Sequence, residues 1–260
     1  FKRFSVDARY DYQLFNDLKA IGFNGTGASP TSIDGTLNGM RIIASLTYRP
    51  TPGVELSVFG GSAILNDLQL TGSNTLVGPV TQSTPLDSAA IYGIGAKVDL
   101  FPSIRFHLGP RFRVLRTDYG STRTTISNPN AACTYDFTTN NTTTCSTVSG
   151  YISGGIVNAR FSQTELLVRL EASVDIVGDI NAPYIGIVAG VEEAMSIVYG
   201  GYTLTPPLST ASPSEIFNLI SKRTEGFYVG LYSYIGPVRI TAEGRGLSVT
   251  AVSGSIGVVF

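Results

Sequence analysis

The final segment of the chain alternates between two kinds of residue up to its last position. Val252, Ile256 and Val258 share one parity with the terminal Phe260, whereas small or polar residues such as Ser253 hold the other parity. Successive side chains of a β-strand point to opposite faces, so period two predicts a strand whose faces meet different surroundings. Similar alternation recurs throughout the chain.

These alternating segments, separated by turn residues, predict an all-β chain of about ten strands. The predicted strands are Phe4–Gln13, Gly39–Arg49, Val54–Leu65, Ser88–Leu100, Ile104–Arg116, Gln163–Val177, Tyr184–Tyr199, Gly226–Ile235, Val238–Arg245 and Val249–Phe260.

The connections between these strands alternate in length. The second, fourth, sixth and eighth are tight turns at Pro50–Gly53, Phe101–Ser103, Gly178–Pro183 and Gly236–Pro237, where proline or glycine sets the turn geometry. The first, third, fifth and seventh are long and rich in Thr, Ser, Asn and Gly, spanning Leu14–Asn38, Asn66–Asp87, Thr117–Ser162 and Gly200–Glu225. Only the ninth connection, near Gly246, breaks the pattern by being short. An even strand number places both termini on the side of the short turns.

Composition points away from an ordinary soluble domain. Charged residues make up 14% of the 260 residues, against roughly 25% in a typical soluble protein. No apolar run reaches the ~18 residues of a membrane helix, yet the mean hydropathy is positive at +0.18. The net charge of −1 argues against a nucleic-acid partner, which selects a basic surface.

Two strands show how each strand divides into an apolar and a charged face. In Ile104–Arg116, Phe106 and Phe112 fall on one face, and Arg111 and Arg113 on the other. In Gln163–Val177, leucine and valine alternate with charged residues of both signs. A charge facing hydrocarbon costs about 2–4 kcal/mol at the bilayer midplane. We therefore expect the apolar faces outside a closed tube and the charged faces in its lumen; the runner-up is a soluble jelly roll with the opposite arrangement.

This pattern predicts a lumen filled by charged side chains. The candidates are Asp7, Arg9, Asp11, Arg41, Lys97, Arg105, His107, Arg111, Arg113, Glu165, Arg169, Glu171, Asp175, Arg239, Glu243 and Arg245. Outward aromatics near strand ends are candidates for interfacial belts: Tyr10, Tyr12, Tyr48, Phe227 and Phe260.

The ten alternating strands, the turn asymmetry and the terminal Phe260 resemble the small outer-membrane β-barrels of Gram-negative bacteria. The resemblance covers the whole chain and implies one transmembrane up-and-down antiparallel barrel over residues 1–260, with short periplasmic turns, periplasmic termini and long extracellular loops. It implies outer-membrane lipid and the outer-membrane assembly machinery, which reads the last strand, as partners. Phe1 stands at the edge of a strand, so we expect a processed or trimmed start, with any upstream segment missing.

Fold alone does not decide the function. One interpretation is a structural or surface-binding protein, with a lumen braced by salt bridges and loops that contact an extracellular ligand or surface. The alternative is a narrow passive channel in which Arg105, Arg111 and Arg113 favour anions. A third is a protease of the omptin type, but the only histidine, His107, lies within a strand and no Asp-x-His motif is present. We therefore expect no enzyme activity, no cofactor and no metal.

Four local features carry separate expectations. Cys133 and Cys145 lie in a polar loop, where a disulfide would indicate an oxidising compartment and free thiols are the alternative.

Ser214–Ser221 has apolar residues compatible with a short helix that packs on the rim of the barrel. Pro110, after Gly109, predicts a bulge or bend. The pair Glu192 and Glu193 breaks the alternation, so the strand either bulges there or has passed the membrane rim.

Overall fold

The computed structural model describes residues 3–24, 32–74, 78–100, 106–121, 125–128, 133–136, 156–177, 184–205 and 214–260. These residues form fourteen strands in one sheet. The strands are β1 Phe4–Asn24, β2 Ser32–Thr51, β3 Val54–Asn74, β4 Gly78–Leu86, β5 Ala89–Val98, β6 Phe106–Ser121, β7 Thr125–Asn128, β8 Cys133–Asp136, β9 Ile156–Val177, β10 Tyr184–Thr205, β11 Ser214–Ser221, β12 Glu225–Ile235, β13 Val238–Gly246 and β14 Thr250–Val259. Within this part of the chain, no helix is long and apolar enough to cross a membrane.

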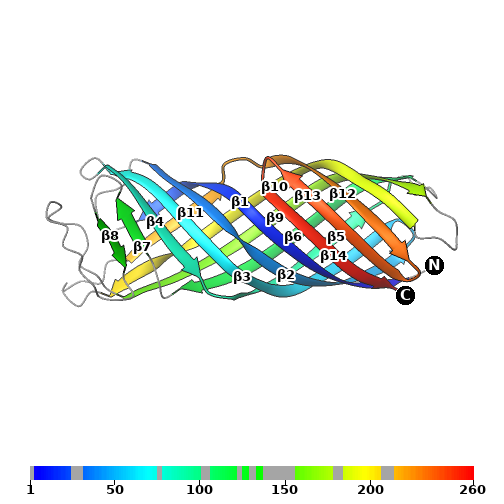
Figure 1. The fold of residues 1–260 in the computed structure, drawn as a ribbon, viewed down its shortest axis with the longest axis horizontal. Coiled ribbons are helices and arrows are strands. Elements are labelled where there is room, and N and C mark those ends of the chain that lie inside the picture. Colours follow the sequence, from blue (N-terminus) through cyan, green and yellow to red (C-terminus); the bar gives the residue numbers. More distant parts are fainter. Residues whose placement is uncertain are drawn as a thin grey trace.

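Ten of the described strands close a ring. Antiparallel pairings run from β1 through β2, β3, β5, β6, β9, β10, β12, β13 and β14, and β14 pairs again with β1. Each of these strands contains or closely matches one predicted segment, so the predicted antiparallel barrel is confirmed. Figure 1 shows the strands tilted along an elongated tube with both chain ends at one end.

The chain ends share one end of the barrel, here called the terminal end, with the two tight turns that the structure describes, Pro50–Gly53 and Gly236–Pro237. Phe4 and Phe260 exchange backbone hydrogen bonds of 2.9–3.0 Å. Their rings stack at 6.3 Å between centroids, and Phe4 also packs on Tyr48, 5.1 Å away, just before the β2–β3 turn. The opposite end, here called the loop end, carries β7 and β8 (Figure 1).

At the loop end the strands continue well beyond the predicted segments. The predicted long loops therefore begin later than expected: β1 extends to Asn24, β3 to Asn74 and β10 to Thr205. The strand β4 adds a further antiparallel partner to β3. The sequence pattern missed these extensions because their outward side chains are mostly polar, whereas the outward side chains nearer the terminal end are apolar.

The predicted helix at Ser214–Ser221 is wrong, because these residues form strand β11. This strand lies between β10 and β1, above the short β13–β14 hairpin, and pairs with both neighbours. The short ninth connection ends that hairpin early, which leaves a gap in the wall that β11 fills. Phe217 and Leu219 point inwards and are buried, whereas Ile216 points outwards and is 41% exposed.

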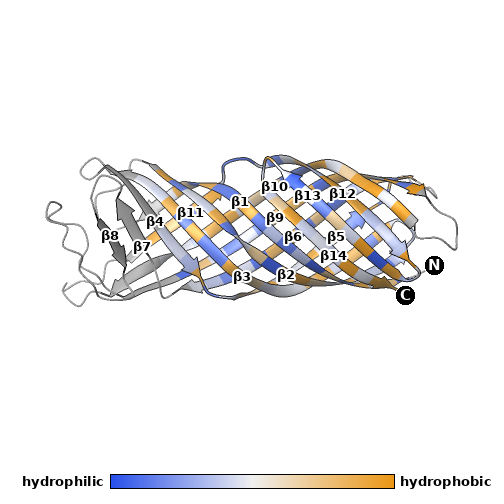
Figure 2. Ribbon diagram, viewed as in Figure 1, coloured by the Kyte–Doolittle hydropathy of each residue, from blue (hydrophilic) through white to orange (hydrophobic). Residues whose placement is uncertain are grey.

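The terminal half of the barrel has the expected inside-out polarity. Phe112 and Ile240 on the outer surface are 46% and 43% exposed, whereas Arg169 and Glu165 inside are only 2% and 3% exposed. The five predicted belt aromatics all face outwards with exposures of 38–60%. Figure 2 shows hydrophobic residues in orange alternating with paler or blue residues along the strands of this half.

In the loop half the interior is apolar, which the sequence reading did not foresee. One continuous cluster of buried side chains fills it: Leu18, Ile33, Leu37, Ile43, Ala63, Leu68, Leu70, Leu86, Ala89, Ile91, Leu115, Tyr119, Phe161, Val198, Phe217 and Leu219. On β1, β2, β3, β6 and β9 the outward side chains at this level are mostly polar, with Ile21 of β1, 57% exposed, as an apolar exception. The polar ones are Asp17, Lys19, Asp34, Thr36, Asp67, Gln69, Arg116, Asp118 and Arg160. On β10 and β11 the exterior stays apolar, with Tyr199 56% exposed.

Two bulges help to exchange the faces. An extra residue in β1 after Gln13 shifts its register against both β2 and β14. In β3, Leu65 adopts a φ of 53° and is 75% exposed. Each inserted residue moves all later side chains to the opposite face. The inward parity in β3 thereby changes from odd at Ala63 to even at Asn66 and Leu68.

Two other predictions about irregular positions are resolved. No bulge occurs at Pro110, because the β6–β9 register runs through it unbroken and the β5–β6 pairing ends one residue away, at Lys97 and Arg111. At Glu192 and Glu193, β10 keeps its register. Glu192 is buried inside, and the exposed Glu193 lies opposite Glu225, the first residue of β12. At this level β10 has therefore reached the end of β12 that lies towards the loop end of the barrel.

Candidate functional site

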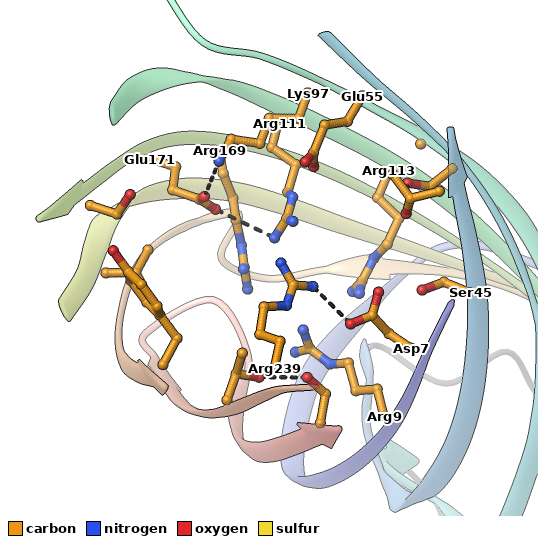
Figure 3. Close-up of a pocket in the computed structure, with 18 of the residues that line it drawn as sticks. Asp7, Arg9, Ser45, Glu55, Lys97, Arg111, Arg113, Arg169, Glu171 and Arg239 are labelled. Carbon is orange, nitrogen blue, oxygen red and sulfur yellow. Dashed lines mark hydrogen bonds and ion pairs between the residues drawn. The ribbon is translucent and has the colours of Figure 1, made fainter. Parts of the chain in front are cut away.

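The terminal half of the lumen encloses a cavity of about 640 Å³. Gly53, Asp99 and Val259 line it where the strands end, so it reaches the terminal end of the barrel. Its charged lining is nearly balanced, with seven basic and six acidic side chains: Arg9, Arg49, Lys97, Arg111, Arg113, Arg169 and Arg239, and Asp7, Glu55, Asp99, Glu171, Asp175 and Glu243. Figure 3 labels part of this lining, and its side chains converge from several strands: Asp7, Arg9, Glu55, Lys97, Arg111, Arg113, Arg169, Glu171 and Arg239.

Glycines in the wall allow tyrosines to lie flat against it. A Cβ at Gly186 of β10 would overlap the Tyr232 ring, which crosses this strand from β12 and donates a hydrogen bond to Asp175 of β9. The Tyr228 ring lies similarly over Gly190, and the Arg169 guanidinium sits 4.0 Å above it. Glycine in a strand commonly marks such a close approach.

Ion pairs link the cavity walls. Glu171 on β9 contacts Lys97 of β5 at 2.8 Å and Arg111 of β6 at 3.4 Å. Arg239 on β13 reaches Asp7 on β1 at 2.9 Å. The Lys97–Glu171 pair crosses the intervening strand β6, and the Arg239–Asp7 pair crosses β14, so these two pairs connect strands that are not hydrogen-bonded neighbours.

A buried layer of ions closes the upper end of the cavity. Arg41 on β2 spans the lumen to Glu165 on β9, with Nη1 2.7 Å from Oε2, and Arg113 holds the other carboxylate oxygen at 2.9 Å. Glu192 similarly accepts from Arg169 and Arg245, both at 2.9 Å. We call these residues, Arg41, Arg113, Glu165, Arg169, Glu192 and Arg245, the ionic layer. Removing one member of such a buried group leaves a partner uncompensated, at a cost of about 3–5 kcal/mol.

Neutral polar groups separate the ionic layer from the apolar cluster above it. Tyr119 donates to Gln163 at 3.0 Å, and Gln163 donates to Ser196 at 3.0 Å. The backbone N–H of Ser196 donates to Ser221 Oγ of β11 at 2.8 Å, which fastens this strand to the same network. Gln13 accepts a hydrogen bond from Arg41. From the terminal end upwards, the lumen therefore holds a charged cavity, the ionic layer, a neutral belt and an apolar core.

The structure places the sequence-predicted lumen residues as follows. All of those that it describes face the interior: Asp7, Arg9, Asp11, Arg41, Lys97, His107, Arg111, Arg113, Glu165, Arg169, Glu171, Asp175, Arg239, Glu243 and Arg245. Arg105 lies outside the described residues, as does Cys145, so the disulfide with Cys133 stays a prediction. His107 lies near the terminal end, with Nδ1 3.5 Å from Asp99 Oδ2.

Sequence reasoning assigned no role to Arg49, Tyr228 or Tyr232. Arg49 shares the odd parity of Arg41, which was the available signal, and it contacts Glu55 at 2.8 Å. The tyrosines gave no signal, because their positions depend on glycines in a different strand.

Two members of the predicted arginine column, Arg111 and Arg113, line the cavity as ion-paired side chains. Arg111 pairs with Glu171 and Arg113 with Glu165, and Arg113 is 7% exposed. Within the same part of the chain, no group of three or more His, Cys, Asp or Glu side chains has a metal-binding arrangement.

Comparisons with known proteins identify the fold. No family model and no curated protein sequence matches the chain. Among solved structures, the outer membrane protease OmpT from Escherichia coli is similar, with a TM-score of 0.52 and 10% identity over 98% of this chain and 97% of that chain. The outer membrane protein OprG from Pseudomonas aeruginosa aligns with 100% of this chain over 96% of the OprG chain, with a TM-score of 0.39 and 8% identity. The similarity to OmpT shows that the chain has the fold of the outer-membrane β-barrels.

Proposed function

We propose that this protein is an integral outer-membrane barrel with a closed lumen, which acts as a structural or surface-binding scaffold. The observation that carries the proposal is the stacking of the ionic layer beneath a continuous apolar core. A conducting pore needs a water-filled path, whereas sixteen buried apolar side chains occupy the loop half of the described interior. The long loops at the opposite end from the termini are the surfaces available for contact.

The location follows from the physics of the exterior. The apolar outer band of the terminal half suits hydrocarbon, and the aromatic cluster of Phe4, Tyr48 and Phe260 suits its interface. We place the termini in the periplasm and expect Phe260 to take part in recognition by the assembly machinery. A disulfide between Cys133 and Cys145 would constrain the largest connection; thiol titration with and without reductant tests it.

Planar-bilayer recording tests the closed lumen. The purified barrel should insert without stable conductance steps, because no continuous aqueous path crosses the apolar core. A variant with Phe161, Phe217 and Leu219 all changed to alanine removes part of that core and should produce measurable steps if it folds. Reduced electrophoretic mobility after heating confirms folding of both proteins. Stable ohmic steps from the unmodified barrel would contradict the proposal.

The second candidate is a narrow passive channel, and the cavity at the terminal end favours it. In that function the ionic layer and apolar core would have to open. Ohmic steps whose anion selectivity falls in an Arg111→Gln variant would support this candidate.

We also propose that the barrel has no protease activity. His107 and Asp99 lie near the terminal end, away from the surface loops on which a protein substrate would be met. Incubation with a mixed fluorogenic peptide library should release no signal above that of a His107→Ala variant.

A further inference from the structure

The cavity of the terminal half contains more buried donors than the surrounding residues satisfy. Arg49 Nη1, Arg113 Nε, Arg169 Nη2 and Arg239 Nε are buried and have no hydrogen-bond partner among the described residues. Only two carboxylate oxygens of the described cavity lining are likewise buried without a hydrogen-bond partner, Asp99 Oδ1 and Asp175 Oδ2. A buried unpaired polar group is costly, more so when it is charged. Each of these four arginines is ion-paired but keeps one buried nitrogen without an acceptor among the described residues.

The unsatisfied arginines belong to a convergent group. Figure 3 shows the guanidinium groups of Arg9, Arg111, Arg113, Arg169 and Arg239 pointing towards a common region of the cavity. They come from β1, β6, β9 and β13, so the closure of the barrel brings them together. Arg169 and Arg113 are almost fully buried, with side chains 1% and 8% exposed, and both line this space.

Two members of the group have room to contact a ligand. The side chains of Arg111 and Arg239 are 29% and 23% exposed, and each contacts one carboxylate, Glu171 and Asp7 respectively. A planar guanidinium presents several N–H donors in a fork that matches the oxygens of phosphate or carboxylate. Their remaining donors are available to an acceptor within the cavity.

We propose that this cavity binds a small oxyanion, of the phosphate or sulfate class, between Arg111, Arg169 and Arg239. The anion supplies acceptors to N–H groups that the paired carboxylates, such as Glu171, Glu243 and Asp7, leave unsatisfied. It enters from the terminal end, so binding requires no path through the apolar core and does not depend on the proposed scaffold function. A single water offers fewer acceptor sites than an oxyanion, so it would not serve three arginines at once.

Isothermal titration of the refolded barrel in zwitterionic detergent, with inorganic phosphate as the probe, tests this site. The expected result is saturable binding of one phosphate per chain. Arg111→Gln should weaken it about tenfold or more, because the variant loses a charge-assisted hydrogen bond to the anion. Arg116→Gln is the matched control: Arg116 has the same chemistry, lies on the outer surface and should leave binding unchanged. Absence of saturable binding to the unmodified barrel overturns the proposal.

The double variant Arg111→Gln with Glu171→Gln keeps the net charge of the cavity. If Arg111 donates to the anion, this variant also binds weakly; binding equal to that of the unmodified barrel overturns the assigned site. Titration with glycerol 3-phosphate distinguishes sources: equal binding of both probes indicates free or esterified oxyanions, and binding of the ester alone rejects inorganic phosphate as the ligand. A silent bilayer without phosphate binding removes this inference and leaves the closed lumen standing.

Discussion

Glu165 connects two opposite walls of the lumen with one carboxylate. Its two oxygens accept from Arg41 and Arg113, which belong to β2 and β6, and the Arg41 contact crosses the barrel interior. All three side chains are at least nine-tenths buried. Both guanidinium groups therefore depend on this one buried carboxylate as their direct ion-pair partner, and the three side chains link the walls on either side of the lumen.

Glu165→Gln should destabilise the barrel by about 3–5 kcal/mol, because two buried guanidinium groups lose their shared counter-charge. Chemical unfolding in phospholipid vesicles, followed by tyrosine fluorescence, measures this difference. Asp118→Asn removes the carboxylate of an exposed pair, with side chains about half exposed, and should change stability by less than about 1 kcal/mol. Equal effects of the two changes would show that the ionic layer does not brace the tube.

A second residue-scale prediction concerns the glycine beneath Tyr232. Gly186→Ala introduces a Cβ into the tyrosine ring and should cost about 1–3 kcal/mol through overpacking. Tyr232→Ala in the same chain should recover part of that loss, giving a non-additive double-mutant cycle. Gly244→Ala is the control, since a Cβ there meets nothing within 4 Å. Additive effects at Gly186 and Tyr232 would rule out the steric explanation.

At the scale of elements, the ten ring strands could be predicted because alternation and turn chemistry agreed in each one. Strand β11 could not, since Ile216, Phe217, Leu219 and Ile220 satisfy either a helical or a strand period in so short a segment. Its pairing depends on the gap above the β13–β14 hairpin, which is a tertiary feature. The loop-half extensions were missed because a bulge at Leu65 exchanges the faces of β3 within one strand. The cross-lumen partners likewise depend on ring closure.

The pairing of β11 with β1 can be tested by cross-linking. Lys19 and Ile220 lie opposite each other in the register, and directly opposed strand residues are close enough for a disulfide. Cysteines at both positions should cross-link on mild oxidation, as detected by mass spectrometry of peptides. The pair Lys19→Cys with Asn218→Cys is out of register and should cross-link much less. Equal yields from the two pairs would contradict the strand assignment.

At the scale of the whole molecule, the exchange of inside and outside divides the barrel into two parts. In the terminal half, the apolar side chains face outwards, where they can contact hydrocarbon, and the charged side chains face the lumen. In the loop half, five strands present polar side chains outwards over an apolar core, as in a soluble barrel. The changeover near Gln13 and Leu65 therefore marks the level at which we expect the barrel to leave the membrane. The remaining apolar exterior on β10 and β11 lies above Glu193 and Glu225.

Cysteine labelling tests this boundary and the orientation together. In cells that express the barrel in their outer membrane, Asp67→Cys should react with a membrane-impermeant maleimide added outside, because it faces water just above the changeover. Val58→Cys, on the same strand and the outward face below it, should be protected by lipid. Both cysteines should react after solubilisation in denaturant, which controls for expression, and the native Cys133 and Cys145 are replaced by serine beforehand. Labelling of Val58→Cys in intact membranes would place the boundary elsewhere, and protection of Asp67→Cys would reject either the protruding half or its outward orientation.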